Sequence, residues 1–169
     1  MAARTHKGPT AGPKAKAAAP VRVKEAHPDE KRFRVLIAVH RPRYRARAER
    51  AVDFPGWLVR SLLNKEDPVG LINQLPPHIL IISDDFGRQK DLGILRAVQR
   101  FRSDGMRIVG LFEEPDIAEI ARPECDFALA MPWKTADVRA VAARIFEEKF
   151  SRTPVGHSAM SNEVSEIEG

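Results

Sequence analysis

The sequence has a single cysteine, Cys125, among its 169 residues. One thiol cannot close an internal disulfide, and the lack of a Cys/His cluster excludes the common zinc sites, a pattern that fits a reducing cytoplasm. No apolar run approaches the roughly 20 residues that a membrane span needs, and the N-terminus lacks the apolar core of a secretory signal. We therefore expect a cytoplasmic protein that does not enter a membrane.

Acidic residues are absent from the first 24 positions, which hold six Lys or Arg and are rich in Ala, Pro and Gly. Such a composition cannot bury an apolar face, so residues 1–32 are expected to form a disordered basic arm that can touch nucleic acid through charge. Residues 151–169 are polar and mildly acidic, and we interpret them as a second disordered tail. The remaining residues, 33–150, are expected to make one compact domain.

Within this domain, short apolar runs alternate with amphipathic segments, which is typical of βα units around a parallel sheet. The runs are short and continuous enough to be strands buried on both faces. The predicted strands are 33–40, 57–63, 78–83, 106–112 and 127–131.

The segments between the strands have helix start and stop signals. Asp67 is a predicted N-cap with Pro68 at the first helical position, and that helix stops before Pro76. A third helix is expected from about 91 to 102, and a fourth from Pro115 to about Pro123. The last helix is expected to take Thr135 as N-cap and to bury one apolar stripe, namely Val138, Val141, Ala142, Ile145 and Phe146. Strict alternation predicts a doubly wound (βα)5 α/β fold with any site at the carboxyl ends of the strands.

From Arg34 to Phe150 the sequence resembles the receiver domain of bacterial two-component response regulators. The stretches that carry the resemblance are "VLIAVHRP", "GW" at 56–57, "QLPPHILIIS", "LGILRAVQRFR" and "MPWKTADVRAVAARIF". The resemblance implies a flavodoxin-like fold whose five parallel strands have the order 2-1-3-4-5. It also implies a regulatory function in phosphorelay signalling.

The residues that perform the family's chemistry are replaced. Receivers hold magnesium with an acidic pair after the first strand, and Val39 and His40 stand in those positions. Ser83 matches the phosphoacceptor aspartate, which places Asp84 and Asp85 one and two residues too late. Phe112 replaces the hydroxyl residue after the fourth strand and Met131 the lysine before Pro132.

These changes together predict a pseudo-receiver, a domain that keeps the fold and is not an enzyme. No metal and no cofactor are expected. The alternative is a shift of one residue in the third strand that would make Asp84 the acceptor. That arrangement would still lack ligands at Val39 and His40 and the lysine at Met131.

The first functional hypothesis is a binding module that contacts a signalling protein or kinase, or forms a homodimer. In the family, the face formed by the fourth helix, fifth strand and fifth helix mediates dimerisation or output. The matching residues are Ile117, Ile120, Trp133, Lys134 and Arg139. Trp133 is either an exposed interface anchor or a core residue beside Pro132.

The second hypothesis is binding of a phosphate-bearing ligand or nucleic acid by the arginine-rich segment "HRPRYRARAER". Its arginines are Arg41, Arg43, Arg45, Arg47 and Arg50, and the alternative is a solvated helix face. An enzyme is the third and weakest hypothesis, and it depends on His40 meeting Asp84 or Asp85 in an acid–base pair.

Overall fold

The computed structural model describes residues 32–63, 65–86 and 92–150. Its centre is a parallel sheet of five strands in the order β2-β1-β3-β4-β5. The strands are β1 (Phe33–Ala38), β2 (Trp57–Ser61), β3 (Ile79–Ser83), β4 (Arg107–Phe112) and β5 (Phe127–Ala130). The structure confirms the doubly wound fold and the strand order that the resemblance implied. The basic arm and the acidic tail predicted at the two ends lie outside the described residues, except for Arg32.

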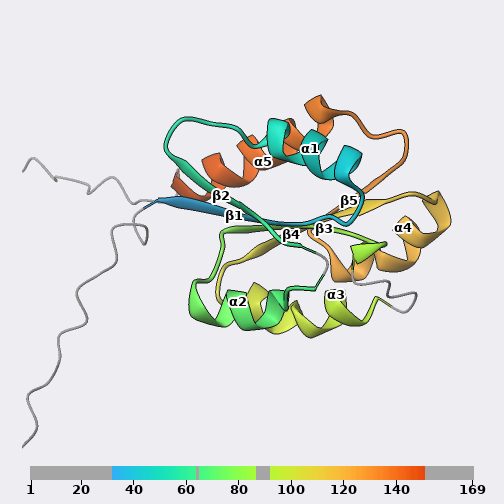
Figure 1. The fold of residues 1–169 in the computed structure, drawn as a ribbon, viewed down its shortest axis with the longest axis horizontal. Coiled ribbons are helices and arrows are strands. Elements are labelled where there is room, and N and C mark those ends of the chain that lie inside the picture. The colour runs from blue at the N-terminus through green and yellow to red at the C-terminus, as the bar shows by residue number, and fades with distance from the viewer. Residues whose placement is uncertain (1–31, 64, 87–91, 151–169) are drawn as a thin grey trace, which may run out of the picture.

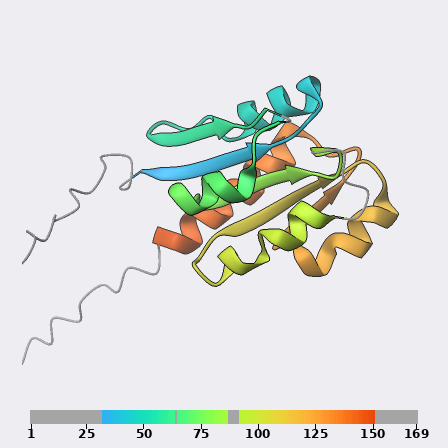
Figure 2. The same cartoon turned by 60° about the horizontal axis from the view of Figure 1, so that its bottom comes forward.

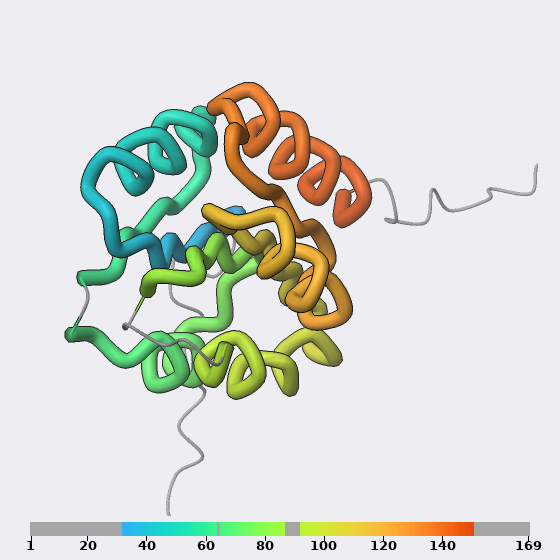
Figure 3. Tube along the Cα trace, turned by 90° about the vertical axis from the view of Figure 1, so that its right-hand side faces the viewer, coloured from blue at the N-terminus to red at the C-terminus, as the bar shows by residue number. Residues whose placement is uncertain are grey.

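Helices cover both faces of this sheet, so the molecule has three layers (Figures 1 and 2). The helices α1 (Pro42–Ala51) and α5 (Thr135–Phe150) lie side by side on one face. The other face carries α2 (Pro68–Gln74), α3 (Gly93–Ala97) and α4 (Pro115–Ala121). Figure 3 views the molecule from the end at which the strands finish, where the loops of a doubly wound sheet form its site.

Each face of the sheet has its own apolar core because successive strand residues point to opposite sides. Ile37, Ile81 and Leu111 pack beneath α1 and α5, whereas Leu36, Leu80 and Ile108 pack beneath α2, α3 and α4. All five residues of β3 are buried, as expected of a central strand covered on both faces.

Most of the predicted helix signals act as expected. The carboxylate of Asp67 accepts hydrogen bonds from the backbone N–H groups of Val69 and Gly70, both at 3.0 Å, and Pro68 opens α2. Pro115 opens α4, which ends at Ala121 and passes into a 3₁₀ turn that includes Pro123.

Two helix predictions differ from the structure. The third helix is divided into α3 and a 3₁₀ helix, Gln99–Arg102, and Leu92 before it has a left-handed backbone with φ of 56°. At the start of α5, the side chain that accepts a backbone hydrogen bond is that of Asp137, from the N–H of Lys134 at 2.7 Å. Thr135, the predicted N-cap, is the first residue inside the helix.

Candidate functional site

The residues that the sequence assigned to a degenerate pocket meet at the carboxyl ends of β1, β3, β4 and β5. The backbone N–H of His40 lies 3.4 Å from Ser83 Oγ and donates to it. Met131 donates its N–H to the carbonyl of Phe112 at 2.9 Å. Ser83 is the last residue of β3, and Asp84 follows in the turn, where the spacing predicted it.

Ser83 is buried and its hydroxyl is already engaged. Its Oγ donates a short hydrogen bond to Asp85 Oδ1. Among the residues that the structure describes, Ser83 is the only polar one that is buried. Val39 is fully buried in the apolar core beneath α1 and α5. Neither position therefore offers a free oxygen to a metal or a phosphoryl group.

Arg41 places a positive charge among the acidic residues of this edge. Its Nη1 donates a short hydrogen bond to Glu113 Oε1, and its Nε lies 3.4 Å from Asp85 Oδ2. Asp85 Oδ2 makes no hydrogen bond with a described residue, so Arg41 neutralises it by charge rather than by a directed bond. Desolvation alone would lower the pKa of Arg41, but the charges of Glu113 and Asp85 outweigh it and raise the pKa.

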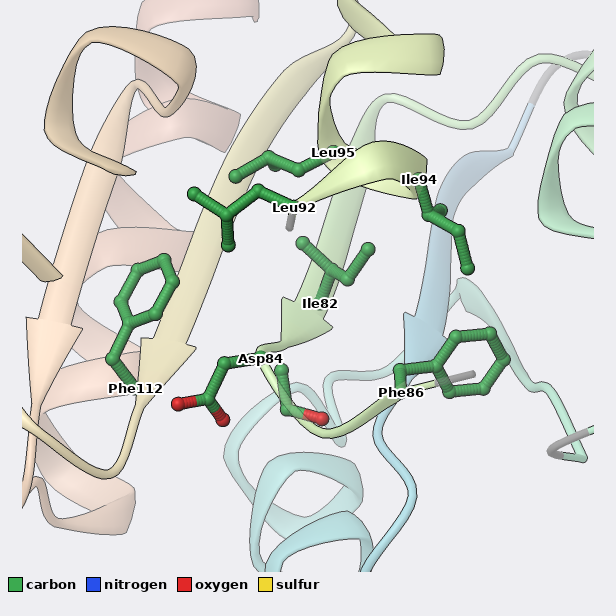
Figure 4. A pocket seen from close by; sticks show the side chains of 8 residues that line it. Ile82, Asp84, Phe86, Leu92, Ile94, Leu95 and Phe112 are labelled. Atoms are coloured by element: carbon green, nitrogen blue, oxygen red, sulfur yellow. The ribbon is translucent and has the colours of Figure 1, made fainter. Parts of the chain in front are cut away.

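Asp84 lies at the mouth of a small hollow that apolar side chains dominate (Figure 4). Its Oδ2 accepts the backbone N–H of Glu113 at 3.1 Å. Burial raises the pKa of Asp84, and the negative charges of Asp85 and Glu113 act in the same direction, against the hydrogen bond from Glu113. The labelled apolar residues of this hollow are Ile82, Phe86, Leu92, Ile94, Leu95 and Phe112.

Phe112, which the resemblance matched to the hydroxyl residue of receivers, is the last residue of β4. The ring lies back over Gly110, two residues earlier on the same face of β4, and a Cβ at Gly110 would clash with it and come within 2.8 Å of Cys125 Sγ. Phe112 is 2 % exposed and packs in the apolar core on this face of the sheet, so it offers no polar group at the end of β4. Burial also raises the pKa of Cys125 to about 12, which makes this thiol unreactive.

The arrangement of strands and helices is similar to that of solved receiver domains. NtrX from Brucella abortus is 18% identical with a TM-score of 0.58, and the match covers 70% of this chain and 28% of that one. A receiver domain of a putative Luxo repressor protein from Vibrio parahaemolyticus is 14% identical with a TM-score of 0.57, covering 73% and 99%. One from Colwellia psychrerythraea 34H, described as a DNA-binding response regulator, is 11% identical with a TM-score of 0.55, covering 68% and 98%.

This chain has the receiver-domain fold. It spans little more than a quarter of the NtrX chain but nearly all of the two separate receiver domains. No protein-family model matches the sequence, and the curated proteins give no significant match. At these identities the likeness establishes the fold, and the function must be argued from the site.

The receiver pocket of this chain does not fit the magnesium ion that the family uses. Magnesium requires oxygen ligands that can approach one point in near-octahedral geometry. Val39 supplies none, and the acidic groups nearby are bound to Arg41 or to the N–H of Glu113. Within the described ranges, no group of three or more His, Cys, Asp or Glu side chains could hold a metal ion.

The five arginines predicted as an anion site, at the start of α1 and within it, do not converge on one point. Arg41 is bound to Asp85 and Glu113, and Arg50 donates to the carbonyl of its own helix at Ala46. Arg47 lies over the ring of Trp133 at 5.1 Å and donates to its carbonyl oxygen. The exposed Arg43 and the half-buried Arg45 are thus the two for which no such contact is seen in the described part of the chain.

The residues predicted for the partner face also do not form one exposed surface. Trp133 is 4 % exposed and packs against Tyr44 at 5.6 Å between ring centroids, so the expectation of an exposed anchor is corrected in favour of the core interpretation. Arg139 lies over Phe54, 4.5 Å from the ring centroid, and therefore faces the loop after α1 rather than α4.

Ile120 and Lys134 of the same face are exposed, whereas Ile117 packs against the core. Sequence reasoning missed Arg144, whose guanidinium lies over Phe127 of β5, 5.5 Å from the ring centroid. It also missed Glu113, because nothing local in "FEEP" indicates a partner 72 residues away.

His40 does not form the acid–base pair that the enzyme hypothesis needs. It contacts Ser83 through its backbone N–H. In the part of the chain that the structure describes, its imidazole ring makes no hydrogen bond with Asp84 or Asp85.

No described helix is long and apolar enough to cross a lipid bilayer.

Proposed function

We propose that this protein is a pseudo-receiver, a regulatory module of two-component or phosphorelay-type signalling that binds a protein partner without phosphoryl transfer. The observation that supports it most strongly is the ion-pair bridge from Arg41 to Asp85 and Glu113. The guanidinium of Arg41 therefore lies at the edge of the sheet where receivers bind a metal ion.

The bridge has a direct electrostatic consequence. Transfer of a phosphoryl group to a carboxylate needs a divalent cation that bridges the acceptor and the phosphoryl oxygens. A guanidinium bound to the available carboxylates repels that cation, and it cannot take the cation's place because it has no vacant coordination site. Met131, which follows β5 at the position matched to the lysine, has no charge to pair with a phosphorylated residue.

The proposed binding surface is the face formed by α4, β5 and α5. In the described sheet β5 is an edge strand, paired with β4 alone, and all four of its residues are partly exposed. Ile120 on α4 is 64 % exposed, an unusual exposure for a large apolar side chain. An exposed apolar residue beside an open strand edge is a typical component of a protein interface.

The surface can be tested with a matched pair of substitutions. Ile120→Asp introduces a charge on this face, whereas Leu63→Asp does the same at an equally exposed residue, 62 %, that follows β2. We expect Ile120→Asp to abolish capture of partners from native cells, or self-association measured by light scattering, and Leu63→Asp to leave both unchanged. Equal effects of the two substitutions would rule out this surface.

The loss of the metal site can be tested independently of any partner. We expect titration of the 15N-labelled protein with MgCl2 to produce no saturable shift at the amides of His40, Asp84, Asp85 or Glu113. Arg41→Ala is the companion variant, because it frees Asp85 and Glu113. Saturable magnesium binding by the unmodified protein at these amides would contradict the proposal.

A further inference from the structure

A second polar cluster lies at the opposite end of the sheet, where β4 begins and α5 ends. A hollow there of about 650 Å³, including its open mouth, is lined by Arg102, Gly105, Arg107, Ile145, Glu148 and Lys149. The receiver pocket lies at the carboxyl ends of the strands, so the two sites are separated by the length of the sheet (Figure 1).

Asp126 holds the two arginines of this cluster in place. Its Oδ1 accepts from Arg102 Nη2 at 3.1 Å and from Arg107 Nη1 at 3.0 Å, while its Oδ2 accepts the N–H of Ile108 at 2.8 Å. Burial opposes ionisation of Asp126, but these hydrogen bonds outweigh it and lower its pKa. The side chain of Asp126 is only 9% exposed, so it lies deeper than the two arginines that it holds.

Two cationic groups at the hollow still have hydrogen-bond donors to offer. Arg107 uses Nη1 on Asp126, and its Nε and Nη2 make no hydrogen bond with another described residue. Lys149 makes no ion pair within the described ranges, and its Nζ lies 3.9 Å from the position that a Cβ would occupy at Gly105. Glu148, the acid that lines the hollow, is paired with Arg144 at 3.0 Å.

Lys149 lies near other positively charged side chains. Desolvation and the positive charges of Arg34 and Arg107 together lower the pKa of Lys149. The same surroundings keep His78 neutral, because desolvation and the charges of Lys149 and Arg34 lower its pKa to about 4. An anion bound between Arg107 and Lys149 would relieve the repulsion between these two groups.

We propose that this hollow binds a small phosphate-bearing anion, with Arg107 and Lys149 as the residues that contact it. Arginine matches phosphate oxygens with its planar fork of donors, and lysine adds a point charge. Gly105 has a φ of 88° and no side chain of its own, so a ligand held by Lys149 can approach the backbone there. Arg102 and Asp126 are positioning residues that fix the guanidinium of Arg107. The site lies at the opposite end of the sheet from the receiver pocket, and it uses the last turns of α5, whereas the test of the partner face is at Ile120 on α4.

The site can be tested by titrating the 15N-labelled full-length protein with inorganic pyrophosphate and, separately, with AMP. We expect saturable shifts at the amides of Gly105, Arg107 and Lys149. A chloride salt that adds the same concentration of negative charge should not produce them. Binding of both probes would indicate a phosphate ester as the ligand, and binding of pyrophosphate alone a free phosphate anion. Because the readout is residue by residue, binding by the basic N-terminal segment does not interfere.

Substitutions decide whether the cluster itself is responsible. Lys149→Gln should weaken pyrophosphate binding by about tenfold or more, because it removes one charge-assisted donor. Lys149→Arg should restore most of the affinity, and Lys65→Gln, at an exposed position between β2 and α2, should leave it unchanged. The proposal is overturned if neither probe gives saturable shifts, or if Lys149→Gln and Lys65→Gln weaken binding equally.

Discussion

Asp84 and Asp85 are neighbours in sequence, yet their surroundings give them opposite energetic roles. Asp84 is held among apolar side chains with a raised pKa, whereas Asp85 is paired with Arg41 and accepts a hydrogen bond from Ser83. The spacing of the sequence correctly placed Ser83 at the strand end and both aspartates after it. It could not reveal Glu113 as the partner of Arg41, because that contact exists only once β1 and β4 lie in one sheet.

Replacing each aspartate by asparagine should therefore change stability in opposite directions. At neutral pH the charged form of Asp84 is penalised by burial, so Asp84→Asn should raise the free energy of unfolding by about 0.5–1 kcal/mol after solvent screening. This gain should disappear on acidification, when the folded protein can protonate Asp84. Asp85→Asn should lower the free energy of unfolding by about 0.5–1 kcal/mol because it weakens the pairing with Arg41. Urea denaturation of the two variants at pH 7 measures both effects, and equal changes of one sign would refute the assignment.

At the scale of elements, local signals predicted which segments become strands and helices. The apolar runs predicted all five strands, and each observed strand is shorter by one or two residues at one end. Asp67 and the prolines at helix starts act locally, which is why their roles could be predicted. The break after α3 could not, because the apolar pattern of residues 92–102 continues through it while the backbone tightens into a 3₁₀ turn.

The cap of α2 should be important because this helix has only seven residues. Asp67→Ala removes the acceptor for two backbone N–H groups and should lower the free energy of unfolding by about 1 kcal/mol. Asn73→Ala, at an exposed position inside the same helix, is the matched control and should have little effect or a slight stabilising one. Chemical denaturation of both variants is the measurement, and a neutral Asp67→Ala would show that packing alone maintains α2.

For the whole molecule, the sheet separates two polar ends with different character. At the carboxyl ends of the strands, Arg41 is paired with Asp85 and Glu113, and a mainly apolar hollow opens beside Asp84. At the amino ends, cations gather around Asp126, and the neutral His78 stacks on Phe33 at 4.8 Å between ring centroids. Neither cluster is contiguous in the sequence, so composition and periodicity could predict the fold but not these arrangements.

The neutral state of His78 predicts a pH dependence of stability. The unfolded chain binds a proton at His78 near pH 6.5, whereas the folded protein does so only near pH 4, where its pKa lies. Between these values the unfolded state holds more protons, so the free energy of unfolding falls as the pH falls from 6.5 to 4. After allowance for solvent screening, we expect His78 to account for about 1–2 kcal/mol of that loss.

Thermal or urea unfolding at several pH values can isolate this contribution. His78→Gln keeps an acceptor for the N–H of Arg34, which bonds His78 Nδ1 at 2.8 Å, and removes the titrating group. The variant should have a flatter stability profile between pH 6.5 and 4 than the unmodified protein. His40→Gln is the matched control for loss of a histidine outside this cluster, and an unchanged slope in His78→Gln would contradict the prediction.

The central claim, a receiver fold that does not accept a phosphoryl group, is tested most directly by chemical phosphorylation. The full-length protein is incubated with acetyl phosphate and MgCl2, and the intact mass is measured with peptide mapping of the β3 turn. The account predicts an unmodified protein. A stable phosphoryl group on Asp84, absent from the Asp84→Asn variant, would contradict it.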